Sequence, residues 1–281
     1  MRRIGAIPSA KNSNLSNQTM EPSSVGYGDF AVSKVRNIQN PVNFVRARQP
    51  VLYSTASSVQ TFMNDYSSYV FIVTYGRSGS TLLQRILNSI DGYFIRGENE
   101  NALFGLYQSY SAALRAKTNF GKKETGEQDP WYGADLLEPE RYGRKLARLF
   151  LNEIIQPGSD ARVVGFKEIR FFLQPFHIES YLQFIETFFH PAKLIFNVRN
   201  PNDVAGSAWW RKKDREEVIT NIQKFHQIAE GYIAKYPNNC FKVRYDDYKA
   251  NPNHLKGLFE FLGEPFEEEK IRRIMATRLK H

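Results

Sequence analysis

The chain has 281 residues, of which 42% are hydrophobic, and it carries a net charge of +9. This length suits one large α/β domain or two small ones with a buried core, and we favour one. The single cysteine, Cys240, excludes an intrachain disulfide and a cysteine metal site, and no apolar run is long enough to span a membrane.

The positive charge predicts anionic partners, such as a nucleotide, a sulfated product, nucleic acid or a membrane surface. A basic surface without a specific partner is the alternative. Polar residues rather than an apolar signal segment follow Met1, so we expect a cytoplasmic protein. Residues 1–66 are expected to form a partly extended or disordered N-terminal arm, and residues 67–281 the globular domain.

Residues 70–87, VFIVTYGRSGSTLLQRIL, predict a strand, a tight glycine turn and a helix. The glycines let the backbone turn sharply, and the first amides of the helix have no carbonyl partners, so they favour an anion. A cation and three hydroxyl groups add to this site, which therefore suits a phosphate. The residues expected to bind it are Gly76, Arg77, Ser78, Gly79, Ser80 and Thr81.

This turn differs from the loop of nucleotide triphosphatases, because no lysine follows Gly79 and only two residues separate the glycines. It resembles the 5′-phosphosulfate-binding loop of sulfotransferases that use 3′-phosphoadenosine 5′-phosphosulfate (PAPS). In that family the loop reads roughly T-Y/C-P-R/K-S-G-T/S-T, and residues 74–81 read TYGRSGST. Gly76 replaces the usual proline, which loosens the turn but keeps every position that contacts the anion.

Glu98 follows a short apolar segment, residues 93–95, one helix after the loop. This position corresponds to the carboxyl end of a second strand, beside the cofactor cleft. A single glutamate is by itself more often a solvated surface charge. The resemblance implies that Glu98 is the catalytic base, because tyrosylprotein and trehalose-type sulfotransferases place their base in a similar segment. Glu100 is the alternative base.

Residues 117–138 lack periodicity and predict an exposed insertion after a helix. In one interpretation it faces the substrate, and Trp131 and Tyr132 stack on a sugar or an aromatic ring. In the other interpretation these aromatic residues pack on the domain. The next helix is expected to begin near Glu138 and to bury Leu146, Leu149, Phe150 and Ile154.

A short buried strand at residues 163–166 is followed by Lys167, Glu168 and Arg170. Charges at the end of an apolar strand face a cleft or pair with one another, so a Lys167–Glu168 or Arg170–Glu168 ion pair is one interpretation. Lys167 also matches a lysine that sulfotransferases with a glutamate base carry near the transferring sulfuryl group. The resemblance therefore implies that Lys167, together with Arg77, stabilises charge during the reaction.

A second match follows the strand predicted at residues 193–198. The family's 3′-phosphate site is an arginine at a strand end and a serine eight residues on, and Arg199 and Ser207 have that spacing. Arg211, on the same helical face as Ser207, is expected to add to the phosphate or ribose contacts. Trp209 and its neighbour are candidates for the cleft wall, although tryptophan is more often part of a core.

Residues 241–248, FKVRYDDY, alternate like a strand and resemble the family segment V-R-Y-E-D-L, whose tyrosine lies near the adenine. Tyr245 is therefore a candidate for contact with the base of the cofactor. A helix is expected to begin at Asn251-Pro252 and to end at Gly263.

The resemblance covers roughly residues 68–265. It implies a three-layer α/β sandwich with a central parallel sheet, the P-loop nucleoside-triphosphatase-like sulfotransferase fold. It implies an enzyme that moves a sulfuryl group from PAPS to an acceptor hydroxyl and releases adenosine 3′,5′-bisphosphate. The glutamate base favours a saccharide acceptor over a tyrosine, a lipid or a phenol. We expect no metal requirement, because cations and amides take the role of Mg²⁺ in kinases.

Two other functions fit parts of the sequence. An ATP-dependent phosphotransferase with an atypical phosphate loop would need Mg²⁺ and a loop lysine, and that lysine is absent. A non-catalytic basic protein that binds nucleic acid would explain the charge, but the sequence has no recognisable aromatic-basic motif or zinc site. We therefore expect a sulfotransferase without a specific nucleic-acid partner.

Overall fold

The structure, a computed structural model, describes residues 66–173 and 177–277. The predicted N-terminal arm lies outside these ranges, except for Tyr66. Within them the strands form one parallel sheet in the order β2-β3-β1-β4-β5. The strands are β1 (Ser68–Val73), β2 (Tyr93–Arg96), β3 (Val163–Glu168), β4 (Ala192–Val198) and β5 (Cys240–Arg244).

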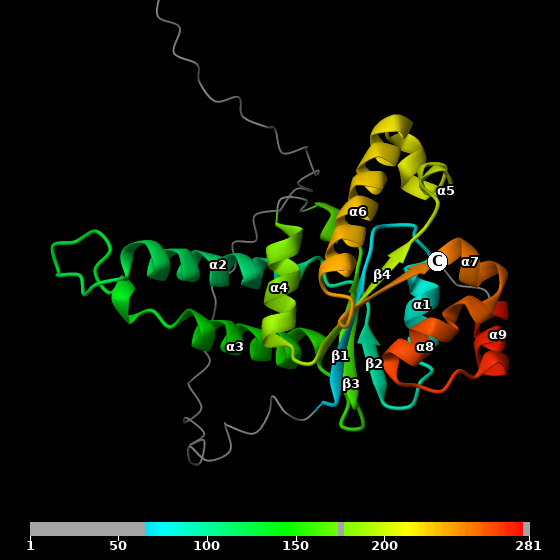
Figure 1. Cartoon of the computed structure of the whole chain (residues 1–281), viewed down its shortest axis with the longest axis horizontal. Coiled ribbons are helices and arrows are strands. Elements are labelled where there is room, and N and C mark those ends of the chain that lie inside the picture. The colour runs from blue at the N-terminus through cyan, green and yellow to red at the C-terminus, as the bar shows by residue number, and fades with distance from the viewer. Residues whose placement is uncertain (1–65, 174–176, 278–281) are drawn as a thin grey trace, which may run out of the picture. The chain divides into compact units, whose positions relative to one another are not determined.

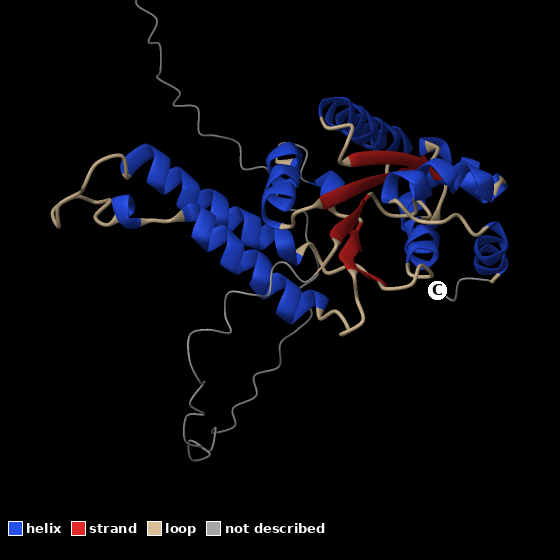
Figure 2. Ribbon diagram, turned by 60° about the horizontal axis from the view of Figure 1, so that its bottom comes forward, coloured by secondary structure: helices blue, strands red, loops and turns tan. Residues whose placement is uncertain are grey.

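Helices cover both faces of the sheet (Figures 1 and 2). One face packs against α2 (Ala102–Phe120), α3 (Pro139–Phe150), α4 (Ile178–Phe188) and α6 (Arg215–Lys235). The other face packs against α1 (Ser80–Leu87), α8 (Lys256–Leu262) and α9 (Glu268–Ala276). Alternate residues of β1 enter the two cores, Phe71 on the first face and Ile72 on the second. The predicted three-layer α/β fold is therefore confirmed.

Short helical segments connect the longer elements. Two are α-helical, α5 (Pro201–Ala205) and α7 (Tyr245–Ala250), and one is a π-helical turn, η2 (Leu151–Ile155). The 3₁₀ turns are η1 (Ala134–Leu136), η3 (Phe171–Leu173), η4 (Ala208–Lys212) and η5 (Pro252–Leu255).

The strand order brings three loops together at one edge of the sheet. β1 lies between β3 and β4, and the chain leaves β1 toward β2 on one side before it crosses to β4 on the other. In a parallel sheet, such a switch point leaves a crevice outside the carboxyl ends of the strands. The loops after β1, β3 and β4 therefore border one crevice.

The insertion after α2 does not face that crevice. α2 continues through Phe120, and the Trp131 ring stacks on the Phe120 ring with centroids 3.8 Å apart. A helix of 19 residues is about 28 Å long, and Glu98 precedes its opposite end. The interpretation in which Trp131 and Tyr132 face the substrate is therefore wrong. Trp131 packs on Phe120 of α2, and α2 and α3 reach away from the sheet (Figure 1).

The buried face expected for α3 is partly wrong. Leu149 is 50% exposed and Ile154 is 37% exposed, whereas Leu151 and Ile155 are buried. The π-helical turn η2 accounts for the second difference, because it is wider than an α-helical turn and buries Ile155 in place of Ile154. Leu149 precedes this turn and lies on the exposed side of α3, next to the buried Phe150.

The strand predicted at residues 241–248 ends early. β5 stops at Arg244 and α7 begins at Tyr245. Two acidic residues in the first turn, Asp246 and Asp247, favour a helix start because they interact with its positive end.

Candidate functional site

The loop after β1 has two left-handed backbone conformations. Gly79, the residue before α1, has a φ of 80°, and Arg77 has a φ of 68°. A Cβ atom on Gly79 would lie 1.9 Å from Cδ2 of Tyr245, so both the conformation and the space require glycine. A non-glycine residue such as Arg77 rarely adopts this conformation, and such strain concentrates at functional sites.

This loop borders a cavity of about 380 Å³ at the carboxyl edge of the sheet. The wall includes most of the residues that the sequence predicted for the site: Gly76, Arg77, Gly79, Ser80, Thr81, Glu98, Arg199 and Tyr245. The wall also contains Ile169 and Trp209. Segments that lie more than a hundred residues apart in the sequence therefore meet around one cavity.

The candidate base is paired with a buried cation. Lys167 Nζ donates to Glu98 Oε1 over 2.5 Å, and the Lys167 side chain is only 5% exposed. Of the two ion pairs considered from the sequence, the Arg170–Glu168 pair is present at 3.0 Å. Lys167 instead reaches the carboxylate that lines the cavity. The two residues predicted for proton transfer and charge stabilisation are thus in direct contact.

Glu168 organises the loop that carries the candidate base. Its fully buried carboxylate accepts hydrogen bonds from the backbone amides of Asn99, Asn101, Ile169 and Arg170, at 2.8 to 3.1 Å. Burial opposes the charged form, but these amides and the Arg170 guanidinium more than offset it, so the pKa of Glu168 lies below its ordinary value. In the sequence, Glu168 was recognisable only as a charge at a strand end.

Glu100, the alternative base, has a different environment. Its side chain is 83% exposed, pairs with Arg170 and is not part of the cavity wall that the structure describes. Glu100 and Asn101 both have positive φ values, 54° and 60°. The backbone is strained where the chain leaves Glu98, and the amides held by Glu168 keep it in place.

Arg199 presents an unused hydrogen-bond donor. Its Nη1 donates to the Arg77 carbonyl at 3.1 Å, and its guanidinium carbon lies 4.9 Å from the centre of the Tyr245 ring. Arg199 Nε is buried and has no hydrogen-bond partner among the described residues. Asp246 Oδ1 is the nearest carboxylate oxygen, but 3.7 Å is too long for a hydrogen bond. A buried donor on a cavity wall fits an anionic group such as a phosphate.

The other residues predicted to bind the cofactor, Ser207, Ser78 and Arg211, are not part of the described cavity wall. Ser207 Oγ accepts from Arg77 Nε at 3.1 Å, so it contacts the loop rather than Arg199. Ser78 is buried, and its hydroxyl accepts from Thr74 Oγ1 at 2.7 Å. Arg211 is exposed on η4 and lies outside the cavity wall as described.

Trp209 occupies the space beside Gly76. A Cβ atom on Gly76 would lie 2.6 Å from Cζ2 of Trp209, and Trp210 Nε1 donates to the Gly76 carbonyl at 3.1 Å. The Arg77 guanidinium carbon lies 5.8 Å from the centre of the Trp209 ring. A glycine in place of the family's usual proline thus makes room for a tryptophan in the wall.

Two further residues stabilise the site and were not predicted. The Tyr75 hydroxyl accepts from the Arg199 amide at 2.8 Å and also contacts the Arg199 carbonyl and His226 Nε2. Asn197 Nδ2 donates to the Ser78 carbonyl at 2.9 Å. The available signals were the match of Tyr75 to the tyrosine of the family loop and Asn197 itself, a polar residue in a mostly apolar strand.

The described residues contain neither a metal-binding cluster nor a membrane-spanning helix. No group of three or more His, Cys, Asp or Glu side chains there is arranged to hold a metal ion. No helix in the same ranges combines the length and apolar character needed to cross a membrane.

Comparison with solved structures identifies similar folds. The sulfotransferase domain of the Synechococcus PCC 7002 olefin synthase is 19% identical, with a TM-score of 0.51, and the match covers 76% of this chain and 79% of that domain. The sulfotransferase domain from the curacin biosynthetic pathway is 18% identical, with a TM-score of 0.43 and coverage of 71% and 75%. Retinol dehydratase in complex with androsterone and inactive cofactor PAP is 18% identical, with a TM-score of 0.36 and coverage of 76% and 65%.

No curated protein matches the chain. A model of the sulfotransferase family matches residues 69–268, which is well over half of the chain and contains the whole cavity wall described above. The first of the three structures shares the α/β fold with a central parallel sheet. The chain belongs to the sulfotransferase family.

Proposed function

We propose that this protein transfers a sulfuryl group from PAPS to an acceptor hydroxyl, with Glu98 as the general base. One observation carries the proposal: Glu98, paired with Lys167, lines the same cavity as the glycine loop and Arg199. A proton acceptor, an anion-binding loop and a second arginine with a free buried donor are the groups that this reaction needs.

The donor supplies the sulfuryl group and leaves as adenosine 3′,5′-bisphosphate. Glu98 accepts the proton of the acceptor hydroxyl while the acceptor oxygen bonds to sulfur and the bond from sulfur to the 5′-phosphate oxygen breaks. Lys167 orients the Glu98 carboxylate toward the cavity and offsets charge on the transferring group. Arg77 and the first amides of α1 stabilise the charge that develops on the departing 5′-phosphate.

Arg199 and Ser207 are assigned to the 3′-phosphate. Arg199 Nε has no hydrogen-bond partner among the described residues. Two hydrogen bonds through Arg77 link Arg199 to Ser207, because Arg77 accepts from Arg199 Nη1 and donates to Ser207 Oγ. Tyr245 stacks against the Arg199 guanidinium and closes the wall next to Gly79, where it is available to the adenine. This second anion site distinguishes PAPS from ATP as the ligand.

Calorimetric titration with adenosine 3′,5′-bisphosphate tests the proposal, with ATP and Mg²⁺ titrated in parallel. We expect tight binding of the bisphosphate in the presence of a chelator. Binding of ATP only with Mg²⁺ would instead support the phosphotransferase alternative.

Three finer predictions accompany the proposed function. The saccharide acceptor rests only on the resemblance to branches with a glutamate base, and the apolar cavity described below favours a different acceptor. The absence of a metal requirement rests on the cations of the site, Arg77, Lys167 and Arg199. The third is a cytoplasmic location.

A further inference from the structure

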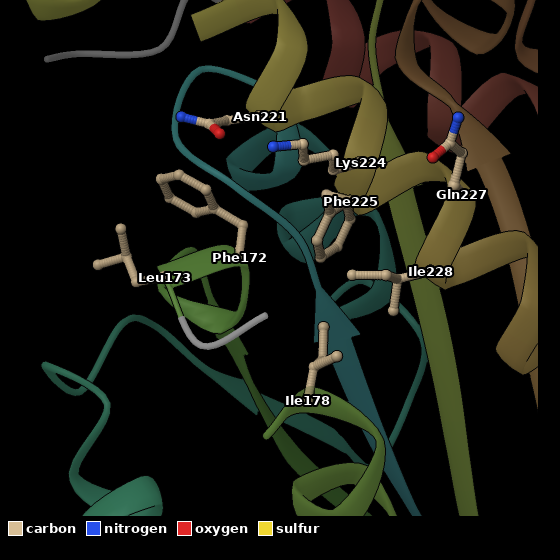
Figure 3. Close-up of a pocket in the computed structure, with 8 residues that line it drawn as sticks. All are labelled: Phe172, Leu173, Ile178, Asn221, Lys224, Phe225, Gln227 and Ile228. Atoms are coloured by element: carbon tan, nitrogen blue, oxygen red, sulfur yellow. The ribbon is translucent and has the colours of Figure 1, made fainter. Parts of the chain in front are cut away.

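A second and larger cavity lies between η3 and α6, with a volume of about 700 Å³. Its walls are mainly apolar: Phe172, Leu173, Ile178, Phe225 and Ile228 (Figure 3). Cavities of this size and lining are typical of sites that bind small organic molecules. The cofactor cavity, in contrast, is lined by arginines, hydroxyl groups and a carboxylate.

The polar groups of the second cavity all come from α6. Asn221, Lys224 and Gln227 are exposed, whereas Phe225 is buried. Lys224 forms no ion pair with any residue in the described ranges, so its ammonium is available to a ligand. The cavity thus combines an apolar interior with a polar rim, which suits a molecule with an apolar body.

The two cavities are adjacent, although no residue lines both. Ile169 lines the cofactor cavity and Phe172 lines the second one, and three residues of chain span about 10 Å at most. Trp209 lines the cofactor cavity, while its neighbour Trp210 packs on Phe172 with ring centroids 5.7 Å apart. The Phe225 ring also packs on the ring of Tyr75 in the phosphate loop, with centroids 5.4 Å apart. A ligand in the second cavity therefore lies beside the residues that line the cofactor cavity.

We infer that the second cavity binds the hydrocarbon body of the acceptor, so that the substrate is an apolar alcohol or phenol rather than a saccharide. This inference rests on the proposed function. The walls made by Phe172, Phe225 and Ile228 offer no hydrogen bonds to replace the water around sugar hydroxyls. An alkyl or aromatic body loses little hydration there and gains from burial.

Two leucines make a matched pair for the test. Leu173 lines the cavity and is 55% exposed, and Leu149 on α3 is 50% exposed and lies outside the wall. Because both side chains are half in solvent, Leu173→Glu and Leu149→Glu should fold equally well. Only the first places a charge beside the bound hydrocarbon.

The first readout is binding of anilinonaphthalene sulfonate, an aromatic fluorescent anion, and its displacement by n-decanol or glucose. We expect n-decanol to displace it and glucose to leave it bound. Leu173→Glu should weaken binding of both apolar molecules about tenfold or more, because the charge beside the bound hydrocarbon removes the gain from its burial. Leu149→Glu should bind them like the wild type.

The second readout separates this inference from the proposed function. Calorimetry with adenosine 3′,5′-bisphosphate should give the same Kd in the wild type and in Leu173→Glu. With labelled PAPS, the KM for n-decanol should rise about tenfold in Leu173→Glu, in proportion to the loss of binding, with the KM for PAPS unchanged.

Three outcomes would count against these statements. A wild type that fails to bind the bisphosphate would reject the proposed function, and the acceptor role of the cavity with it. Normal bisphosphate binding with equal n-decanol binding in both leucine variants would overturn the inference alone. So would sulfation of glucose with a higher kcat/KM than n-decanol.

Discussion

Lys167 and Glu98 lie 69 residues apart in the sequence, and their side chains meet at 2.5 Å. Lys167 is the next-to-last residue of β3, and Glu98 follows β2, the strand that pairs with β3. The pairing of these two parallel strands brings both side chains to the same edge of the sheet. Because the Lys167 ammonium is buried, its contact fixes the carboxylate at the cavity wall.

Glu98→Gln is expected to lower turnover roughly a hundredfold or more, the usual scale for loss of a general base. Bisphosphate affinity should remain nearly unchanged, because the amide is the same size as the carboxylate. Glu100→Gln is the matched control, since Glu100 lies outside the cavity wall. Steady-state sulfation assays measure both, and an active Glu98→Gln beside an inactive Glu100→Gln would transfer the role of base to Glu100.

Glu168→Gln is expected to lower kcat by at least about tenfold, because displacement of a catalytic group by a fraction of an ångström is costly. The substitution removes the charge that holds the amides of Asn99 and Asn101, so the Glu98 loop shifts. The KM for PAPS should stay near the wild-type value, because Glu168 is not part of the described cavity wall.

Glu264→Gln is the control for Glu168→Gln, since it breaks a paired carboxylate, the Arg162–Glu264 ion pair of 2.8 Å, at the amino end of β3. Both variants should lose stability in thermal unfolding. Only Glu168→Gln should lose turnover, and an equal effect of both would show that Glu168 has no positioning role.

The lowered pKa of Glu168 predicts that the free energy of unfolding depends on pH. The folded-state pKa of Glu168 lies below its ordinary value of 4.5, so its stabilisation is complete above that pH. It is lost as the pH falls through the folded-state pKa, because the folded state must then accept a proton that breaks the amide contacts. The stability difference between the wild type and Glu168→Gln should therefore shrink as the pH is lowered below 4.5. Urea unfolding at a series of pH values measures it, and a difference that is constant with pH would contradict the assignment.

Arg199→Ala is expected to weaken bisphosphate binding by about tenfold to a hundredfold, the range for loss of a charge-assisted hydrogen bond. Arg211→Ala removes the same side chain from an exposed position outside the cavity wall, so its effect on the Kd should be much smaller. Calorimetric titration of both variants gives the comparison. Equal losses would mean that exposed Arg211 contributes as the sequence predicted, and an unchanged Kd in Arg199→Ala would reject the 3′-phosphate assignment.

Gly76→Ala is expected to destabilise the protein by about 1–3 kcal/mol, the scale of overpacking. The new methyl group would lie 2.6 Å from Trp209 Cζ2, so the tryptophan must move. Adding Trp209→Ala should recover most of this loss, since it removes the clash. Thermal unfolding of the two single variants and the double variant measures the coupling, and strictly additive effects would contradict it.

Local sequence features predicted the fold and many of the residues that line the cofactor cavity. The strand, glycine turn and helix at residues 70–87 follow from spacing alone, because a φ near 80° at Gly79 requires glycine and a helix start exposes amides. The segment that ends in Arg199 was also recognisable from neighbouring residues. These features depend on interactions within a few residues, which a sequence pattern records directly.

The tertiary structure decided which groups act together. The sequence shows Glu168 only as a charge at a strand end, whereas in the structure its buried carboxylate binds the amides of Asn99 and Asn101. Trp209 can line the cavity because Gly76 leaves space for its ring. The apolar cavity between η3 and α6 joins residues about fifty positions apart. Burial and contact at such separations depend on how helices pack on the sheet. The π-helical turn, which exposes Ile154 and buries Ile155, shows how little of that packing a periodic pattern contains.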